Sequence, residues 1–259
     1  MSHNIRARRR FISAIGIVLA APIARSAMSA EGSTSDDAAR KLVARADEIR
    51  FPRESFQTDV TITNFTDDKA GEERKYRVLS RGTEDTIVLS MAPASERGQA
   101  LLMRGRDLWI FMPAVSQPVR LSLAQRLTGQ VANGDLARAN FAGDYDPALL
   151  GAESLDGSDT QVLELTAVDR GVTYAKVKYW VAQKDGRPVR AEFYALSGRL
   201  LKTCRYEDFR ELAGRVRPTR LVLEDALKKG EKSVMTYQTM QVRDLPERMF
   251  TREYLRRLE

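Results

Sequence analysis

The side chains that most often carry nucleophilic, acid-base or metal chemistry are scarce in this sequence. It contains one histidine, His3, and one cysteine, Cys204, among 259 residues. His3 lies in an N-terminal segment that we expect to be removed, so a Ser-His-Asp triad or a histidine metal site is not expected in the mature chain. Cys204 has no second cysteine for a disulfide and lies in a predicted strand, which favours a structural thiol. We expect no cofactor and no metal.

Three aspartates are the remaining candidates for chemistry: Asp135, Asp144 and Asp146. Two carboxylates alone can hydrolyse a glycosidic bond, and the pair Asp144-x-Asp146 could contribute to a calcium site. Aspartates beside glycines are also typical of caps and turns, and this second interpretation is favoured. The chain is therefore not expected to be an enzyme, and a carboxylate-based hydrolase is kept as an alternative.

Residues 1–30 are typical of an export signal. They hold five arginines and no acid, and the apolar run from Phe11 to Ala24 is too short to span a bilayer. Arg8, Arg9 and Phe11 resemble the twin-arginine pattern, with a general secretory signal as the alternative. No cysteine comes directly after the apolar run, so we expect a soluble periplasmic protein without a lipid anchor.

The positive charge of the chain belongs largely to this signal. The whole sequence has 42 basic and 35 acidic residues, and removal of the five arginines leaves 37 against 35. A nearly balanced chain gives no electrostatic reason to expect a nucleic-acid partner. The remaining residues, 31–259, are expected to form a single domain and a monomer.

The elements that must position any site are one helix and many strands. Apolar residues recur at helical spacing from Ala38 to Ile49, after a predicted N-cap at Ser35 and before Pro52. From Phe56 onward the apolar period changes to two, and polar, glycine-bearing turns join the runs. We count about eleven strands in an antiparallel meander. This pattern predicts a mainly β (α+β) fold, an incomplete antiparallel barrel whose open concave side is covered by helices.

The stretch Ser122 to Tyr145 interrupts the strand pattern. It is predicted to be a helical insertion, cut by three glycines, with apolar residues at loose helical spacing: Leu123, Leu127, Val131, Leu136 and Phe141. Short helices on glycine hinges suit a lid over an opening. A fixed helical cover of the core is the other interpretation, and both remain open.

A hairpin lies at the centre of the chain, with arms Gln99–Met103 and Leu108–Met112 around Gly105. Both faces of the second arm are apolar, so it must be covered on both sides by protein or by a ligand. The order Gly-x-x-Leu-Trp-x-aromatic-x-Pro, carried by Gly105, Leu108, Trp109, Phe111 and Pro113, resembles the central hairpin of the periplasmic lipoprotein carriers, the LolA/LolB-like superfamily, and most closely its outer-membrane lipoprotein-sorting branch. The resemblance continues through Val177–Trp180, Val189–Tyr194, Gly198–Lys202 and Phe250–Leu255.

This resemblance implies a carrier that binds the acyl chains of a lipoprotein or lipid in an apolar cavity for transfer toward the outer membrane. An inner-membrane transporter would be the donor. A lipid-sensing regulatory protein of the same fold is the alternative. The family's Gly-Ser-Asp-Phe-like segment is replaced here by Asn133-Gly134-Asp135-Leu136 and then Phe141-Ala142-Gly143-Asp144-Tyr145, which leaves the cargo open. The residues expected to line the cavity are Val60, Ile62, Leu102, Trp109, Phe111, Val177, Tyr179, Phe193 and Leu221.

Overall fold

The computed structural model describes residues 28–138 and 140–255, so Arg8, Arg9 and Phe11 of the expected export signal lie outside the described part. Helix α1 (Met28–Arg50) precedes all the strands. The expected helix is present and ends before Pro52, but it begins upstream of Ser35, which is therefore not its N-cap. Among the described residues no helix is both long and apolar enough to cross a membrane.

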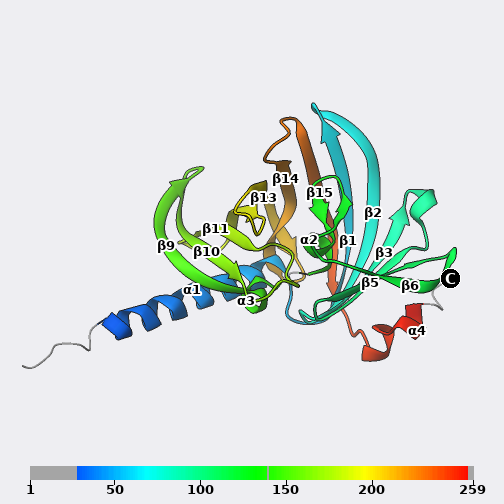
Figure 1. The fold of residues 1–259 in the computed structure, drawn as a ribbon, viewed down its shortest axis with the longest axis horizontal. Helices are drawn as coiled ribbons and strands as arrows, with labels where there is room; N and C mark the ends of the chain where they lie inside the picture. The colour runs from blue at the N-terminus through cyan, green and yellow to red at the C-terminus, as the bar shows by residue number, and fades with distance from the viewer. Residues whose placement is uncertain (1–27, 139, 256–259) are drawn as a thin grey trace, which may run out of the picture.

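Thirteen strands form one unclosed antiparallel sheet (Figure 1). Its first half contains β1 (Phe56–Thr66), β2 (Lys69–Arg81), β3 (Asp85–Ala92), β4 (Ala100–Arg104), β5 (Asp107–Met112) and β6 (Val115–Leu121). Its second half contains β9 (Tyr145–Leu155), β10 (Ser158–Ala167), β11 (Lys176–Ala182), β12 (Pro188–Tyr194), β13 (Leu200–Leu212), β14 (Arg215–Asp225) and β15 (Glu231–Val242). The halves join where β1 pairs with β15, which leaves β6 and β9 as the two edges.

The mainly β, unclosed sheet agrees with the sequence, but the count of about eleven strands was too low. The two uncounted strands of the sheet are its edges, β6 and β9. Each has only one neighbouring strand and contains a proline, Pro118 or Pro147. Edge strands bury fewer side chains than central strands, so apolar and polar residues alternate less clearly along them. Proline, which is found mainly in edge strands, also weakens the strand signal in the sequence.

One face of the sheet, here called the inner face, carries the larger hydrophobic cluster. Side chains of strands from both halves pack there with Ala39, Val43 and Ala46 of α1, all fully buried. Figure 1 shows α1 running along the second half of the sheet, where it packs against β9. The apolar stripe read from the sequence of this helix is thus the surface that covers the sheet.

The opposite, outer face carries a second cluster in the first half of the sheet. Leu102 and Phe111 pack there with Phe250 and Leu255, and Trp109 packs against the same cluster. Phe250 and Leu255 belong to the chain after β15, which includes the short helices η2 (Glu247–Met249) and α4 (Arg252–Leu255). The two apolar faces of β5 are therefore both covered by protein, one by each cluster.

The chain between β6 and β9, residues 122–144, is here called the crossing segment, because it must pass from one edge of the sheet to the other. It contains a two-stranded sheet of β7 (Arg126–Thr128) and β8 (Val131–Ala132), and the short helices α2 (Asn133–Ala137) and α3 (Phe141–Asp144). The predicted helical insertion is thus only partly helical. Gly129 makes the turn between β7 and β8 with φ +50°, where a Cβ atom would lie 2.0 Å from Asn64 Oδ1. The remaining short helix, η1 (Ala94–Glu96), lies between β3 and β4.

Candidate functional site

A cavity of about 310 Å³ lies between the end of α1, the inner face of β1–β3 and the crossing segment. Apolar side chains from all three parts line it: Ala44, Phe51, Phe56, Val78, Leu136, Ala137 and Tyr237. The hydroxyls of Thr58 and Ser80 also line it, and they donate hydrogen bonds to the carbonyls of Thr239 and Gly82. The lining also includes the charged residues Asp47, Glu48 and Arg53. Because the two hydroxyls are already satisfied, the part of the wall that apolar residues form suits an apolar ligand.

Two further spaces lie on the inner face. One of about 250 Å³ opens between β2–β6 and the crossing segment and is lined by Val88, Leu101, Ile110, Leu121 and Leu127, among others. The other, of only about 20 Å³, lies at the centre of the molecule beside Phe141, Phe193 and Leu221. A space of that size holds about one water molecule, so it is a packing gap rather than a ligand pocket.

The residues that the sequence predicted to line one cavity are divided between the two faces of the sheet. Leu102, Trp109 and Phe111 lie in the outer-face cluster. The other six pack in the inner-face cluster: Val60, Ile62, Val177, Tyr179, Phe193 and Leu221. Trp109 and Phe111 are therefore not brought together with Val177 and Tyr179, because successive residues of a strand point to opposite faces and the register decides which is inside.

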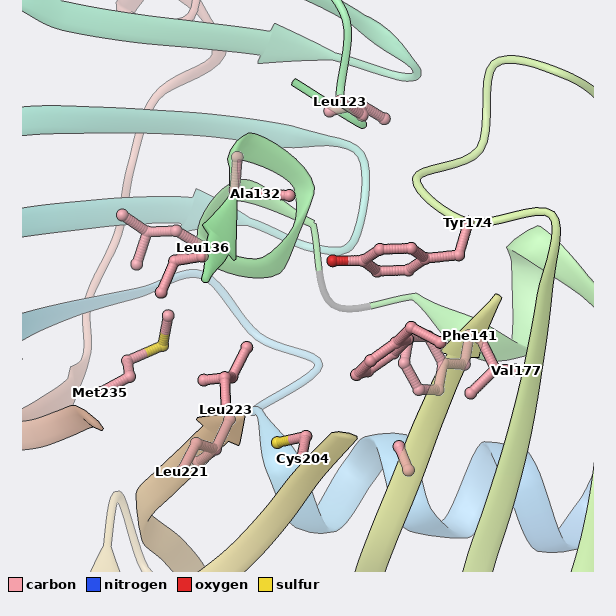
Figure 2. Packing of buried hydrophobic residues seen from close by; sticks show 14 of the residues in the cluster. Leu123, Ala132, Leu136, Phe141, Tyr174, Val177, Cys204, Leu221, Leu223 and Met235 are labelled. Carbon is pink, nitrogen blue, oxygen red and sulfur yellow. The ribbon is translucent and has the colours of Figure 1, made fainter. Parts of the chain in front are cut away.

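The five apolar residues expected in a lid all face the core. Leu123, Val131, Leu136 and Phe141 are buried in the inner-face cluster, and Leu127 packs against it. Figure 2 shows Leu136 on the side of α2 that faces Met235 and Leu223, with Ala132 and Leu123 above it. Only Leu136 of the five lines the 310 Å³ cavity.

Asp135 anchors the crossing segment to the second half of the sheet. Its carboxylate accepts hydrogen bonds from the hydroxyl of Tyr174 at 2.8 Å and from Nζ of Lys202 at 2.5 Å. Figure 2 shows the Tyr174 hydroxyl pointing toward α2. Burial, and then the charge of Asp135, raise the pKa of Tyr174 well above its ordinary value, so this hydroxyl remains a donor. The Asn-Gly-Asp-Leu stretch thus supplies a buried anchor.

Arg138 anchors the same segment to the first half of the sheet. Its guanidinium donates to Asp144 through Nε and through Nη2, the latter at 2.7 Å, and to the carbonyl of Gly105 at 2.8 Å. Asp144 also accepts from Arg106 Nε at 3.0 Å, and Arg106 pairs with Asp169. Side chains of Arg138 and Asp144 are 3% and 4% exposed. This cluster joins the β4–β5 turn, the crossing segment and the β10–β11 loop.

Asp47 and Arg50 connect α1 to the crossing segment. Asp47 accepts from Arg50 Nη1 at 3.2 Å and from the backbone N–H of Ala142 at 2.8 Å. The Arg50 guanidinium lies 4.3 Å from the centre of the Phe141 ring. Burial raises the pKa of Asp47 to about 6, although Arg50 and two backbone N–H groups favour its charged form.

The three candidate carboxylates all form ion pairs: Asp135 with Lys202, Asp144 with Arg138 and Arg106, and Asp146 with the exposed Arg40. This favours structural roles for them over hydrolysis. Within the described residues no group of three or more His, Cys, Asp or Glu side chains could hold a metal ion. Burial raises the pKa of Cys204 to about 12, which keeps it a protonated thiol.

Sequence reasoning missed the basic members of these anchors, Arg50, Arg138 and Lys202. For two of them a signal was present. Arg50 continues the helical spacing of Ala39, Val43 and Ala46, and Lys202 alternates with Cys204 on the inner face of β13. A charged side chain at an inward position implies a buried partner. Arg138 follows a short helix and gives no such signal.

Comparison with known proteins identifies relatives of the whole fold. A family model described as "Uncharacterized protein" matches residues 82–257. The crystal structure of a LolA superfamily protein from Nitrosomonas europaea is 60% identical, covers 83% of this chain and 98% of its own, and has a TM-score of 0.80. No curated protein matches the chain.

Two more distant structures show the fold alone. A putative outer membrane lipoprotein-sorting protein domain from Vibrio parahaemolyticus is 19% identical, covers 86% of this chain and 100% of its own, and has a TM-score of 0.74. A DUF1329 family protein from Desulfovibrio piger is 21% identical, covers 85% of this chain and 99% of its own, and has a TM-score of 0.73.

The Arg138 cluster predicts a large loss of stability when one partner is removed. Arg138→Met should lower the free energy of unfolding by about 3–5 kcal/mol, because it leaves the buried Asp144 carboxylate without its main partner. The double variant Arg138→Met/Asp144→Leu should recover much of that loss. Urea unfolding measures both, with Arg120→Met in an exposed pair as a control costing about 1 kcal/mol or less. A loss below 1 kcal/mol in Arg138→Met would contradict the anchoring role.

The raised pKa of Asp47 predicts that the free energy of unfolding depends on pH. Its carboxyl takes up a proton near pH 6 in the folded chain but only near pH 4 in the unfolded chain. The folded state therefore gains stability from this group as the pH falls through that interval and loses it as the pH rises. Asp47→Asn should remove this slope, a change on the order of 2 kcal/mol between pH 7 and pH 4. Urea unfolding at several pH values tests it, and identical slopes for both proteins would refute it.

Proposed function

Because this chain belongs to the LolA superfamily, we propose that it is a carrier that binds an acyl chain of a lipoprotein or lipid in the 310 Å³ cavity beneath α1. The cavity carries this proposal, since seven apolar side chains and two hydroxyls already hydrogen-bonded to the backbone form much of its lining, beside the charged residues Asp47, Glu48 and Arg53. Each methylene moved from water into such a space contributes about 0.8 kcal/mol. A chain of moderate length would therefore bind without any charged contact.

The size of the cavity limits the ligand. Its volume lies at the lower end of the range of about 300–1,000 Å³ typical of ligand pockets, so one acyl chain fits better than several. The neighbouring space of about 250 Å³ lies across α2 and could take a second chain. None of the nine residues named from the sequence lines either space. In this proposal the six inner-face residues belong to the packed core of the carrier, and Leu102, Trp109 and Phe111 belong to its outer-face cluster.

The setting of the proposed carrier follows from the expected export signal. We propose a soluble periplasmic monomer that receives its cargo from an inner-membrane transporter and delivers it toward the outer membrane. The LolA superfamily relative and the lipoprotein-sorting fold support this route. The identity of the cargo is left open in the proposal.

The crossing segment is proposed to be the lid. It forms one wall of both larger spaces, and it is held by side-chain anchors, while among the described strands β7 and β8 pair only with each other. It can therefore move without breaking the ladder of the large sheet. The anchors at Asp47, Asp135 and Arg138 would hold it closed in the empty carrier, and the free energy of ligand binding would offset their loss.

An environment-sensitive fatty-acid probe tests the cavity. The substitution Ala44→Trp should weaken probe binding at least tenfold, because it fills the space from the α1 side. Ala38→Trp on the exposed side of the same helix is the matched control and should bind like the wild type. Trp109→Ala should lose stability but keep probe affinity, since Trp109 lies against the outer-face cluster. Unchanged affinity in a folded Ala44→Trp variant would place the ligand elsewhere.

A disulfide tests the lid. Asn64 on β1 donates to the Thr128 hydroxyl on β7 at 2.8 Å, so Asn64→Cys/Thr128→Cys would join the crossing segment to the sheet. Oxidation should slow exchange of bound probe at least tenfold, and a reductant should reverse this. Cys204 should not interfere, because its thiol is buried and its pKa is about 12. If oxidised and reduced forms exchange probe at the same rate, the crossing segment is a fixed cover.

A further inference from the structure

Three alternate hairpin connections of the second half lie together at one end of the sheet. They are the β10–β11 loop (168–175), the β12–β13 turn (195–199) and the β14–β15 turn (226–230). In an antiparallel meander every second connection falls at the same end. Backbone hydrogen bonds confirm that these are neighbours: Ala175 N–H donates to the Tyr194 carbonyl at 3.2 Å, and Ala226 N–H to the Leu201 carbonyl at 3.0 Å.

Each of these connections presents one large aliphatic side chain to solvent. Val168 is 44% exposed, Leu196 is 81% exposed and Leu227 is 66% exposed. A single exposed aliphatic residue is ordinary on a protein surface. Their repetition at three adjacent loop tips forms a group that no part of the described chain covers.

Each connection also carries exposed cations: Arg170, Arg199, and the pair Lys228 and Lys229. Within the described residues none of these four side chains forms a salt bridge, although the charge of Lys228 contributes to lowering the pKa of Asp225. The acids beside them are engaged, Asp169 with Arg106 and Asp225 as acceptor of the N–H groups of Leu227 and Lys228. The next hairpin, β1–β2, carries Asp67 and Asp68 and limits the basic surface on that side.

A groove of about 310 Å³ connects these loops to the crossing segment. Arg126, Arg199, Lys202 and Lys228 line it together with Leu201 and Leu227, and Asp225 is the only acid in its lining. Gly129 to Ala132 of the crossing segment form its other wall. The basic and apolar side chains therefore border the segment that we propose as the lid.

We propose that the three connections form a docking surface for a phospholipid bilayer with anionic headgroups. Aliphatic side chains at loop tips can enter the boundary between headgroups and acyl chains, while flanking Arg and Lys side chains pair with the phosphates. Charge complementarity selects this partner, since the cations form no salt bridge and each connection carries its aliphatic residue within three positions of a cation. Docking in this way turns the crossing segment toward the membrane, and it does not depend on which cargo is carried.

Site-directed fluorescence on the full chain tests the surface. A polarity-sensitive dye is attached to Leu196→Cys or Leu227→Cys, and to Lys184→Cys in the β11–β12 turn at the opposite end of the sheet as the control. Cys204 is buried and should not react. With vesicles containing about 30% phosphatidylglycerol in phosphatidylcholine, dyes at 196 and 227 should shift to the blue and the dye at 184 should not. Pure phosphatidylcholine or high salt should abolish the shift.

Charge variants complete the test. The first variant, made in the Leu196→Cys background, is Arg170→Gln/Arg199→Gln/Lys228→Gln/Lys229→Gln. It should lower the vesicle partition coefficient at least 100-fold, because each cation near an anionic membrane contributes about fivefold to binding. The matched control Lys41→Gln/Arg45→Gln/Lys184→Gln/Arg210→Gln removes four exposed cations elsewhere and should bind like the parent. The basic residues 1–30 are the same in every variant.

Three outcomes would overturn the proposal: no dye shift on anionic vesicles, an equal shift at position 184, or equal binding by the two charge variants. An absent shift would favour an acidic protein partner for these loops. None of these measurements uses the fatty-acid probe, so failure here is distinct from failure of the proposed cavity.

Discussion

The crossing segment is imposed by the topology of the sheet. The first six strands extend from β1 to one edge, and the last seven return from the other edge to pair β15 with β1. The chain between β6 and β9 must therefore pass over the inner face. Because the large sheet supplies no ladder partners to it, its polar backbone and side chains need other partners. Short helices, a two-stranded ladder and buried ion pairs provide them.

The anchors of this segment are more polar than an ordinary core. The buried pair Lys202–Asp135 connects the segment to the second half of the sheet. Arg138 and Asp144 form a buried ion pair within the segment, and they reach the first half through the Gly105 carbonyl and Arg106. Such pairs contribute little net stability, but breaking one leaves a buried charge, so they select one arrangement. Apolar contacts of Leu123, Leu136 and Phe141 add the nonspecific part of the attraction. A cover held by a few directional contacts can have one closed position and still be released.

The two faces of the sheet are covered by different parts of the chain. The inner face holds α1, the crossing segment and the spaces suited to a ligand, while the outer face of β2–β5 is closed by the chain after β15. This explains why the central hairpin is apolar on both faces without both faces meeting a ligand. Arg252 lies 5.7 Å from the Trp109 ring, so the C-terminal chain contributes to that cover through charge as well as through Phe250.

Local pattern in the sequence was enough to predict the central strands, the α1 stripe and the mainly β class, because periods of two and 3.6 reflect which side chains face a core. The motif around Trp109, together with the order of the matching stretches that follow it, was enough to indicate the family. There was only a weak signal in the sequence for the edge strand at Val119 and Leu121 and none for β9, because edge strands bury fewer side chains. Sequence reasoning also mispredicted the form of residues 122–145, where apolar residues at loose helical spacing indicated a helical insertion. Tertiary structure alone decided that Trp109 faces outward and Tyr179 inward, since register is set by pairing between distant strands. It also decided the partners of Asp135, Arg138 and Lys202. Asp135 and Lys202 lie far apart in the chain, and Arg138 and Asp144 are separated by the end of a helix, so no local pattern relates them.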